Sequence, residues 1–125
     1  MGEQSYQLKG RHLLVVEDEY IIASDLARSL EDCGAEVIGL AGSVEDALEL
    51  VERNGERIDG AVLDVNLRDE RVYPVADALV AHGLPFVFTT GYDTVAIPEA
   101  YAGVPRCEKP VDIARLVRLL AKARS

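Results

Sequence analysis

Hydrophobic and polar positions along this chain alternate between two patterns, short apolar runs and segments with helical spacing. Short, nearly continuous apolar runs occur at residues 12–16, 36–40, 60–64 and 85–89, with a weaker one at 104–108. Such runs, rich in Val, Leu and Phe, are typical of strands that are buried on both faces of a parallel sheet. The pattern therefore predicts five strands.

Between the first runs the apolar spacing becomes helical. Ile22, Leu26 and Leu30 recur every four residues, and Gly34 follows them as a stop signal. Residues 43–46 resemble a capping box, which predicts a second helix that ends at Asn54-Gly55.

The second half of the chain continues the alternation. Pro74 can begin a third helix, which is predicted to end at Gly83. Asp112 is expected to cap a last helix, where apolar residues recur at i, i+3, i+4 and i+7. Pro98 interrupts residues 94–102, so the fourth helix is expected to be short or mobile.

Short strands that alternate with amphipathic helices predict right-handed crossovers and one doubly wound α/β domain. We expect a five-stranded parallel sheet with helices on both faces, formed by residues 11–125. Residues 1–10 are expected to form a loose extension in which Leu8 is the one obvious anchor. In such sheets a ligand site lies beyond the carboxyl ends of the strands, where the strand order reverses.

Composition narrows the class of protein. The length of 125 residues suits one domain, and the formal net charge is −9. Such a charge disfavours nucleic acid and anionic membranes as partners. The sequence has neither a membrane-spanning apolar run nor a signal-peptide block. Without these segments we expect a cytoplasmic protein. Cys33 and Cys107 lie in apolar stretches, and a reduced pair is expected in preference to a disulfide between them.

Ionisable or hydroxyl side chains end four of the five predicted strands. Because parallel strands present their carboxyl ends at one rim, these side chains are expected to converge there. They are Glu17-Asp18-Glu19, Asp64, Thr89-Thr90 and Glu108-Lys109.

The carboxylates of this group need a cation or protons. Two like charges 4 Å apart repel by about 4 kcal/mol at an effective dielectric near 20. Glu17, Asp18 and Asp64 could together hold Mg²⁺, which prefers oxygen ligands. The alternatives are that Asp18 only caps the following helix and that Asp64 is a solvated residue at a strand end.

Asp64 also suits phosphoryl transfer, since a carboxylate can attack phosphorus to form an acyl phosphate. Lys109 and a Thr hydroxyl would then hold the transferred oxygens. Gly91 leaves space beside Thr90, whereas Thr89 should face the other side of the sheet. Taken singly, the threonines could reflect β-propensity alone, and the lysine could be an ordinary surface charge.

These residues resemble the receiver domain of two-component response regulators, over residues 11–123. The resemblance implies the flavodoxin-like receiver fold. It rests on Leu-Leu-Val-Val-Glu-Asp-Glu at 13–19, Leu-Asp-Val-Asn-Leu at 63–67, Thr90, and Lys109-Pro110, a pair that the family often joins through a cis bond.

The resemblance implies that Asp64 accepts a phosphoryl group from a sensor histidine kinase or a histidine phosphotransfer protein. Lys109 would bridge to the phosphoryl oxygens, and Thr90 would move toward them on activation. Mg²⁺ would be held by Asp18, Asp64 and the backbone carbonyl of Asn66, with Glu17 acting directly or through water.

Two segments resemble a narrower subgroup, the single-domain "FAT GUY" receivers. They are Tyr-Pro-Val-Ala-Asp at 73–77 and Pro-Phe-Val-Phe-Thr-Thr-Gly-Tyr at 85–92, with Thr89 in place of the subgroup's alanine. The position at which many receivers carry a switch aromatic is Arg106 here. Tyr92 or Tyr101 could take over that role, although Tyr101 could equally belong to the core.

Three kinds of function remain to be compared. A phosphoryl-accepting module without an effector domain after Ser125 would act by binding a downstream protein target or by draining phosphate from a kinase. A haloacid-dehalogenase-type phosphohydrolase would need an aspartate where Asn66 stands, which argues against an enzyme. An interaction domain that does not depend on phosphorylation is the third. The sequence shows no dinucleotide-binding, P-loop, EF-hand or zinc spacing.

Overall fold

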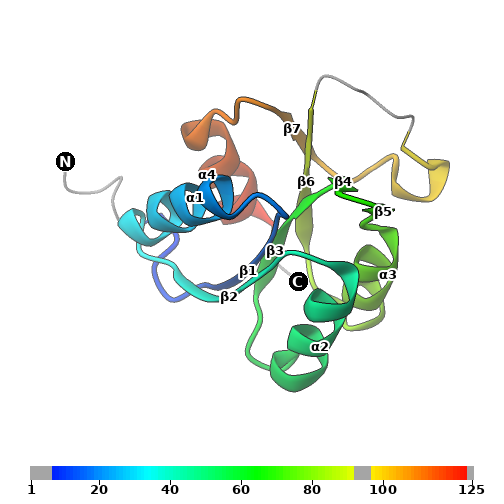
Figure 1. Ribbon diagram of the computed structural model, residues 1–125. Helices are drawn as coiled ribbons and strands as arrows, with labels where there is room; N and C mark the ends of the chain where they lie inside the picture. Colours follow the sequence, from blue (N-terminus) through cyan, green and yellow to red (C-terminus); the bar gives the residue numbers. More distant parts are fainter. Residues whose placement is uncertain (1–6, 92–96, 124–125) are drawn as a thin grey trace.

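A five-stranded parallel sheet forms the centre of the computed structural model, which describes residues 7–91 and 97–123 (Figure 1). The strand order is β2-β1-β3-β6-β7, so the order reverses between β1 and β3. This is the predicted doubly wound, flavodoxin-like fold. The strands are β1 (His12–Val16), β2 (Glu36–Ala41), β3 (Gly60–Asp64), β6 (Phe86–Thr90) and β7 (Arg106–Glu108).

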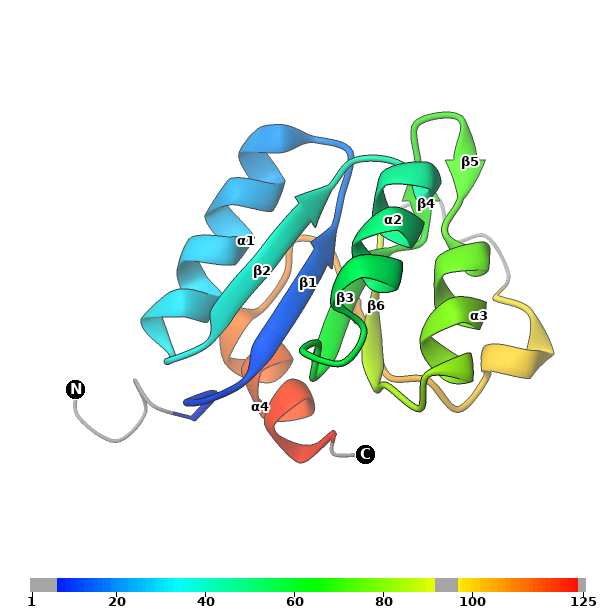
Figure 2. The same ribbon diagram turned by 90° about the horizontal axis from the view of Figure 1, so that it is seen from below.

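Within the described residues, four α-helices cover the two faces of the sheet (Figures 1 and 2). The helices α1 and α4 pack on one face, and α2 and α3 pack on the other, each pair over its own apolar cluster. Their bounds are α1 (Tyr20–Asp32), α2 (Val44–Asn54), α3 (Tyr73–Ala81) and α4 (Ile113–Lys122).

Because side chains alternate along each strand, the strands contribute residues to the apolar clusters on both faces of the sheet. In β3, Ala61 and Leu63 belong to the cluster under α2 and α3, whereas Val62 belongs to the cluster under α1 and α4. Every residue of β3 and of β6 is buried. Burial on both faces explains why these strands read as continuous apolar runs in the sequence.

Two predicted helix caps are confirmed. The Ser43 hydroxyl accepts a hydrogen bond from the Asp46 N–H at 3.1 Å, and the Asp112 carboxylate accepts one from the Arg115 N–H at 3.3 Å. Asp18 is not a cap of this kind, since the N-cap of α1 is Glu19, which makes no capping side-chain hydrogen bond. The capping alternative therefore does not account for Asp18.

The fold departs from the sequence pattern after β3 and after β6. Two short antiparallel strands, β4 (Asn66–Leu67) and β5 (Glu70–Arg71), form a hairpin in a segment for which no strand was predicted. Only the 3₁₀ helix η2 (Glu99–Tyr101) represents the fourth helix in the described residues. Its short length agrees with the interruption by Pro98, and residues 92–96 lie outside the described part.

The described residues that directly precede β1 are attached to the domain through Leu8. Leu8 is fully buried in the cluster under α1 and α4, and its N–H donates to the Cys33 carbonyl at 2.8 Å. Across the described residues, none of the helices combines the length and the apolar character that crossing a membrane requires.

An aromatic cluster lies between α3, β6 and η2. Tyr73 stacks on Tyr101 with ring centroids 5.4 Å apart, and both rings meet Phe88 edge-on. Tyr101 is 8% exposed and belongs to the core. The Tyr73 hydroxyl is buried without a hydrogen-bond partner among the described residues. Burial also raises the pKa of Tyr73, against the opposing influence of Arg71 and Arg106.

Replacing Tyr73 by Phe should stabilise the protein by about 1 kcal/mol, because the ring is kept and an unpaired buried hydroxyl is removed. Urea unfolding measures the change. Tyr101→Phe, which alters the stacked partner, is the matched control and should have a smaller effect. A loss of stability in Tyr73→Phe would show that the hydroxyl has a partner after all.

Candidate functional site

Three carboxylates meet where the strand order reverses. Glu17 and Asp18 follow β1, and Asp64 is the last residue of β3, the strand that pairs with β1. Ligand oxygens of these three residues lie within 4.8 Å of one another. The structure therefore brings together the carboxylates that the sequence placed at this rim.

Lys109 compensates two of these carboxylates. Its Nζ donates hydrogen bonds to Glu17 Oε1 and to Asp64 Oδ2, both at 2.9 Å. Glu17 is 5% and Asp64 is 4% exposed, so each would be costly to bury without a partner. The lysine comes directly after β7, and its peptide bond with Pro110 is cis.

The same contacts determine the charge state of the lysine. Burial alone would lower the pKa of Lys109, but its hydrogen bonds with Asp64 and Glu17 and their negative charges outweigh burial and raise the pKa. The ammonium form therefore persists at neutral pH.

Backbone N–H groups donate to the second oxygen of each of the two carboxylates that contact Lys109. Asp64 Oδ1 accepts a hydrogen bond from the Asn66 N–H at 3.1 Å, and Glu17 Oε2 accepts one from the Glu19 N–H at 3.1 Å. The side-chain oxygen of Asn66 is buried and has no hydrogen-bond partner in the described part of the chain. Both buried carboxylates are thus oriented by the loop that follows their own strand.

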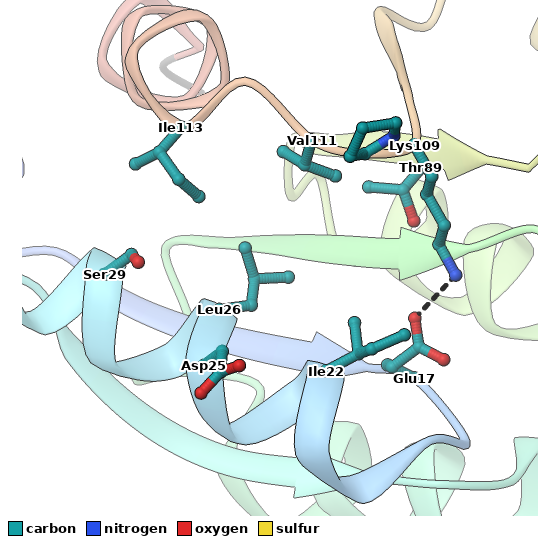
Figure 3. Close-up of a pocket in the computed structure, with 10 residues that line it drawn as sticks. Glu17, Ile22, Asp25, Leu26, Ser29, Thr89, Lys109, Val111 and Ile113 are labelled. Atoms are coloured by element: carbon teal, nitrogen blue, oxygen red, sulfur yellow. Dashed lines mark hydrogen bonds and ion pairs between the residues drawn. The ribbon is translucent and has the colours of Figure 1, made fainter.

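The two threonines that end β6 serve different faces of the sheet. Thr89 lines a groove between α1 and α4, together with Glu17 and Lys109 (Figure 3). Thr90 is two residues beyond Phe88, which belongs to the cluster under α2 and α3, so it faces the same side. The Thr90 hydroxyl is buried and lacks a partner among the residues described. Strand alternation thus separates the two hydroxyls, as the sequence predicted.

A cleft of about 350 Å³ opens over the carboxylates. The predicted site residues that line it are Glu17, Asp18, Asp64, Asn66, Gly91 and Lys109, and the further ones are Glu19, Leu67 and Arg68. Arg68 was not predicted: its Nε lies 3.8 Å from Asp18 Oδ2, at ion-pair distance. An exposed arginine in a polar segment carries no distinguishing signal in the sequence.

The remaining candidates lie away from the cleft or outside the described residues. Arg106 is exposed on β7, where its carbonyl accepts a hydrogen bond from Arg115. Tyr101 is packed in the aromatic cluster. Neither residue lines the cleft, and Tyr92 lies outside the described part of the chain.

The apolar groove in Figure 3 is a second feature that the sequence did not predict. It has a volume of about 310 Å³, and Ile22 and Leu26 of α1 face Val111 and Ile113 across it. Its end at Glu17 joins the groove to the acidic cleft, because Glu17 lines both.

The donor set of the cleft fits a hard divalent cation. Three carboxylates face one ammonium, which leaves two negative charges uncompensated by Lys109. The carboxylates and the unpartnered Asn66 side-chain oxygen are oxygen donors of the kind that Mg²⁺ prefers. Both the charge and the chemistry of the cleft are therefore compatible with Mg²⁺.

Comparison with known proteins finds receiver domains. SdrG from Sphingomonas melonis Fr1 is 39% identical, with 89% of this chain and 93% of that chain covered and a TM-score of 0.78. The receiver domain of the hybrid histidine kinase CckA is 30% identical, with 86% and 93% covered and a TM-score of 0.71. No protein-family model matches the chain.

A curated relative is longer than this chain. The transcriptional regulatory protein PdtaR from Mycobacterium tuberculosis is 29% identical over 111 residues, which make up 86% of this chain and 53% of PdtaR. The chain therefore spans about half the length of this relative.

Without divalent metal, Asp18→Asn should stabilise the protein by about 1 kcal/mol, because it removes one of three clustered like charges. Lys109→Met should destabilise it by about 2–4 kcal/mol, because two buried carboxylates lose their cation. Thermal unfolding in EDTA measures both changes. Asp69→Asn, at an exposed position in the turn between β4 and β5, should be nearly neutral. A stabilising Lys109→Met would contradict this view of the site.

Proposed function

This chain belongs to the receiver-domain family of response regulators, and on that premise we propose that it accepts a phosphoryl group on Asp64 in a Mg²⁺-dependent reaction. The observation that carries the proposal is the placement of the Asp64 carboxylate. It ends β3 at the reversal of strand order, and it is held between the Lys109 ammonium and the Asn66 N–H. We propose a phosphohistidine of a sensor kinase or a phosphotransfer protein as the donor.

The proposed step forms a bond between one carboxylate oxygen of Asp64 and phosphorus. The bond from phosphorus to the donor nitrogen breaks, and its electron pair stays on the imidazole, which takes up a proton from solvent. Mg²⁺ bound at Asp18, Asp64 and the Asn66 carbonyl, with Glu17 acting directly or through water, would supply positive charge against the phosphoryl oxygens.

Lys109 and Thr90 would then respond to the new group. An acyl phosphate replaces the Asp64 carboxylate by a group with about two negative charges, to which the Lys109 ammonium can donate. The Thr90 hydroxyl has no hydrogen-bond partner among the described residues. Thr90 directly precedes Gly91, which lines the cleft. We infer that Thr90 turns toward the phosphoryl oxygens and that β6 transmits this change.

Asn66 favours a signalling role over catalytic turnover. A phosphohydrolase of similar fold needs a carboxyl group at that position to act as an acid and a base, and an amide cannot take this role. We therefore propose that each chain keeps one phosphoryl group until slow hydrolysis or transfer removes it.

Output is proposed to occur through protein contacts or through drainage of phosphate from a kinase. The exposed side chains Tyr20 and Ile21 lie on α1 directly after the acidic residues and support docking of the donor protein there.

The free thiols of Cys33 and Cys107 support a reducing, cytoplasmic location. The motifs at 73–77 and 85–92 support assignment to the FAT GUY subgroup.

Incubation with acetyl phosphate and Mg²⁺ should add the mass of one phosphoryl group to the protein, because Asp64 is the proposed acceptor and each chain has one Asp64 carboxylate. Intact-mass measurement should show no addition for Asp64→Asn or in EDTA. Asp69→Asn removes the same charge from the neighbouring turn and should be labelled like the wild type. Equal labelling of Asp64→Asn and wild type would refute the assignment of Asp64.

Thr90→Val should leave labelling largely intact but should weaken the conformational response, because it removes the hydroxyl and keeps the branched shape. Backbone NMR spectra with and without beryllofluoride measure the response at β6 and β7. Thr89→Val, which alters the opposite face of the same strand, is the matched control. A full response in Thr90→Val would exclude Thr90 as the switch.

A further inference from the structure

Arg68 occupies the turn of the β4–β5 hairpin, at the mouth of the acidic cleft. Asn66 pairs with Arg71, and Leu67 pairs with Glu70, so only Arg68 and Asp69 form the turn. The arginine lines the cleft together with the three carboxylates and Lys109. The hairpin thus projects a cation toward the acidic residues from outside the main sheet.

The hairpin is anchored on both sides of this turn. Leu67 is 3% exposed and packs in the cluster under α2 and α3. At its base, the Val72 N–H donates to the Val65 carbonyl at 3.1 Å. Glu70 accepts a hydrogen bond from the Val44 N–H, in the first turn of α2, at 2.9 Å. The Arg68 backbone is therefore held in place, although its side chain is 76% exposed.

Charge compensation in the cleft is divided between two cations. The hydrogen bonds of Lys109 go to Glu17 and to Asp64. Asp18 is the third member of the carboxylate cluster with Glu17 and Asp64, and its ion pair is with Arg68 at 3.8 Å. This contact is longer than a hydrogen bond and the arginine is exposed, so the pair is weak and can be exchanged.

We propose that Arg68 is a positioning residue that exchanges partners as the site is loaded. It pairs with Asp18 while the site holds no metal, and Mg²⁺ binding to Asp18 releases it. The released guanidinium then binds the oxygens of the incoming phosphoryl donor. This inference rests on the proposed function and adds to it a residue that recruits the anionic donor.

Electrostatics favours an arginine at this place. The protein carries a net charge of −9, which repels an anionic donor such as acetyl phosphate. A guanidinium at the mouth of the cleft offsets this repulsion locally, and its planar fork can donate two hydrogen bonds to phosphoryl oxygens. Asp64 still performs the transfer, in which its oxygen bonds to phosphorus while acetate leaves with the electron pair of the broken bond.

The proposal predicts two effects of opposite sign for Arg68→Gln. Mg²⁺ should bind about two- to fivefold more tightly, because Asp18 no longer exchanges an ion pair for the metal. The acetyl phosphate concentration that gives half-maximal labelling rate should rise about three- to tenfold, with little change in the maximal rate. A merely structural role would not improve metal binding while it impairs donor binding.

The experiment uses the full chain, calorimetric Mg²⁺ titration and intact-mass labelling. Arg71→Gln is the matched control, because it removes the same charge from an exposed position of the same hairpin that does not line the cleft. It should leave both quantities close to wild type. Both differences between Arg68→Gln and wild type should shrink in 0.5 M salt, since they are electrostatic.

The outcomes separate this inference from the proposed function. If the wild type is labelled and Arg68→Gln matches Arg71→Gln in donor dependence, the role of Arg68 is refuted and that of Asp64 stands. Unchanged or weaker Mg²⁺ binding in Arg68→Gln would also overturn the exchange. Absence of labelling in the wild type would count against the proposed chemistry of Asp64 with a small phosphoryl donor, and the Mg²⁺ titration would still decide whether Arg68 competes for Asp18.

Discussion

The contact of the Lys109 ammonium with Glu17 and Asp64 is the interaction on which the site depends. It joins the residue after β7, at one edge of the sheet, to the ends of β1 and β3 at its centre. Two carboxylates that are almost completely buried can lie side by side because one cation donates to both. The side chains at the carboxyl ends of the strands are therefore held together by the charges of Lys109, Glu17 and Asp64, whereas the sheet itself is stabilised by apolar packing.

The negative charge of the three carboxylates is only partly compensated by Lys109. One ammonium cannot balance three carboxylates, so negative charge in the cleft remains uncompensated by Lys109. Arg68 supplies part of the missing positive charge from the hairpin, and in the proposed function Mg²⁺ supplies the rest. The buried Thr90 hydroxyl and Asn66 side-chain oxygen have no partners in the described part of the chain. Unsatisfied buried groups beside an excess of charge are compatible with the rearrangement of Thr90 proposed above.

Local patterns were sufficient to predict the elements of the main sheet and the caps at Ser43 and Asp112. They failed at β4 and β5, because two-residue strands are too short to show any period. The pattern also left open whether Tyr101 belongs to the core, and its stacking on Tyr73 answers that question. Arg68 escaped prediction because an exposed arginine in a loop looks the same in the sequence whether or not it faces a site.

The sequence by itself determined the alternation of strands and helices and the residue types that end each strand, because periodicity and capping act over a few neighbouring positions. Only the tertiary structure decided which of those carboxylates form hydrogen bonds with the Lys109 ammonium. Lys109 is 92 residues from Glu17 and 45 from Asp64, and the strand order alone brings them within 2.9 Å. The division of the carboxylates between Lys109 and Arg68 likewise depends on contacts across the fold, which no local pattern encodes.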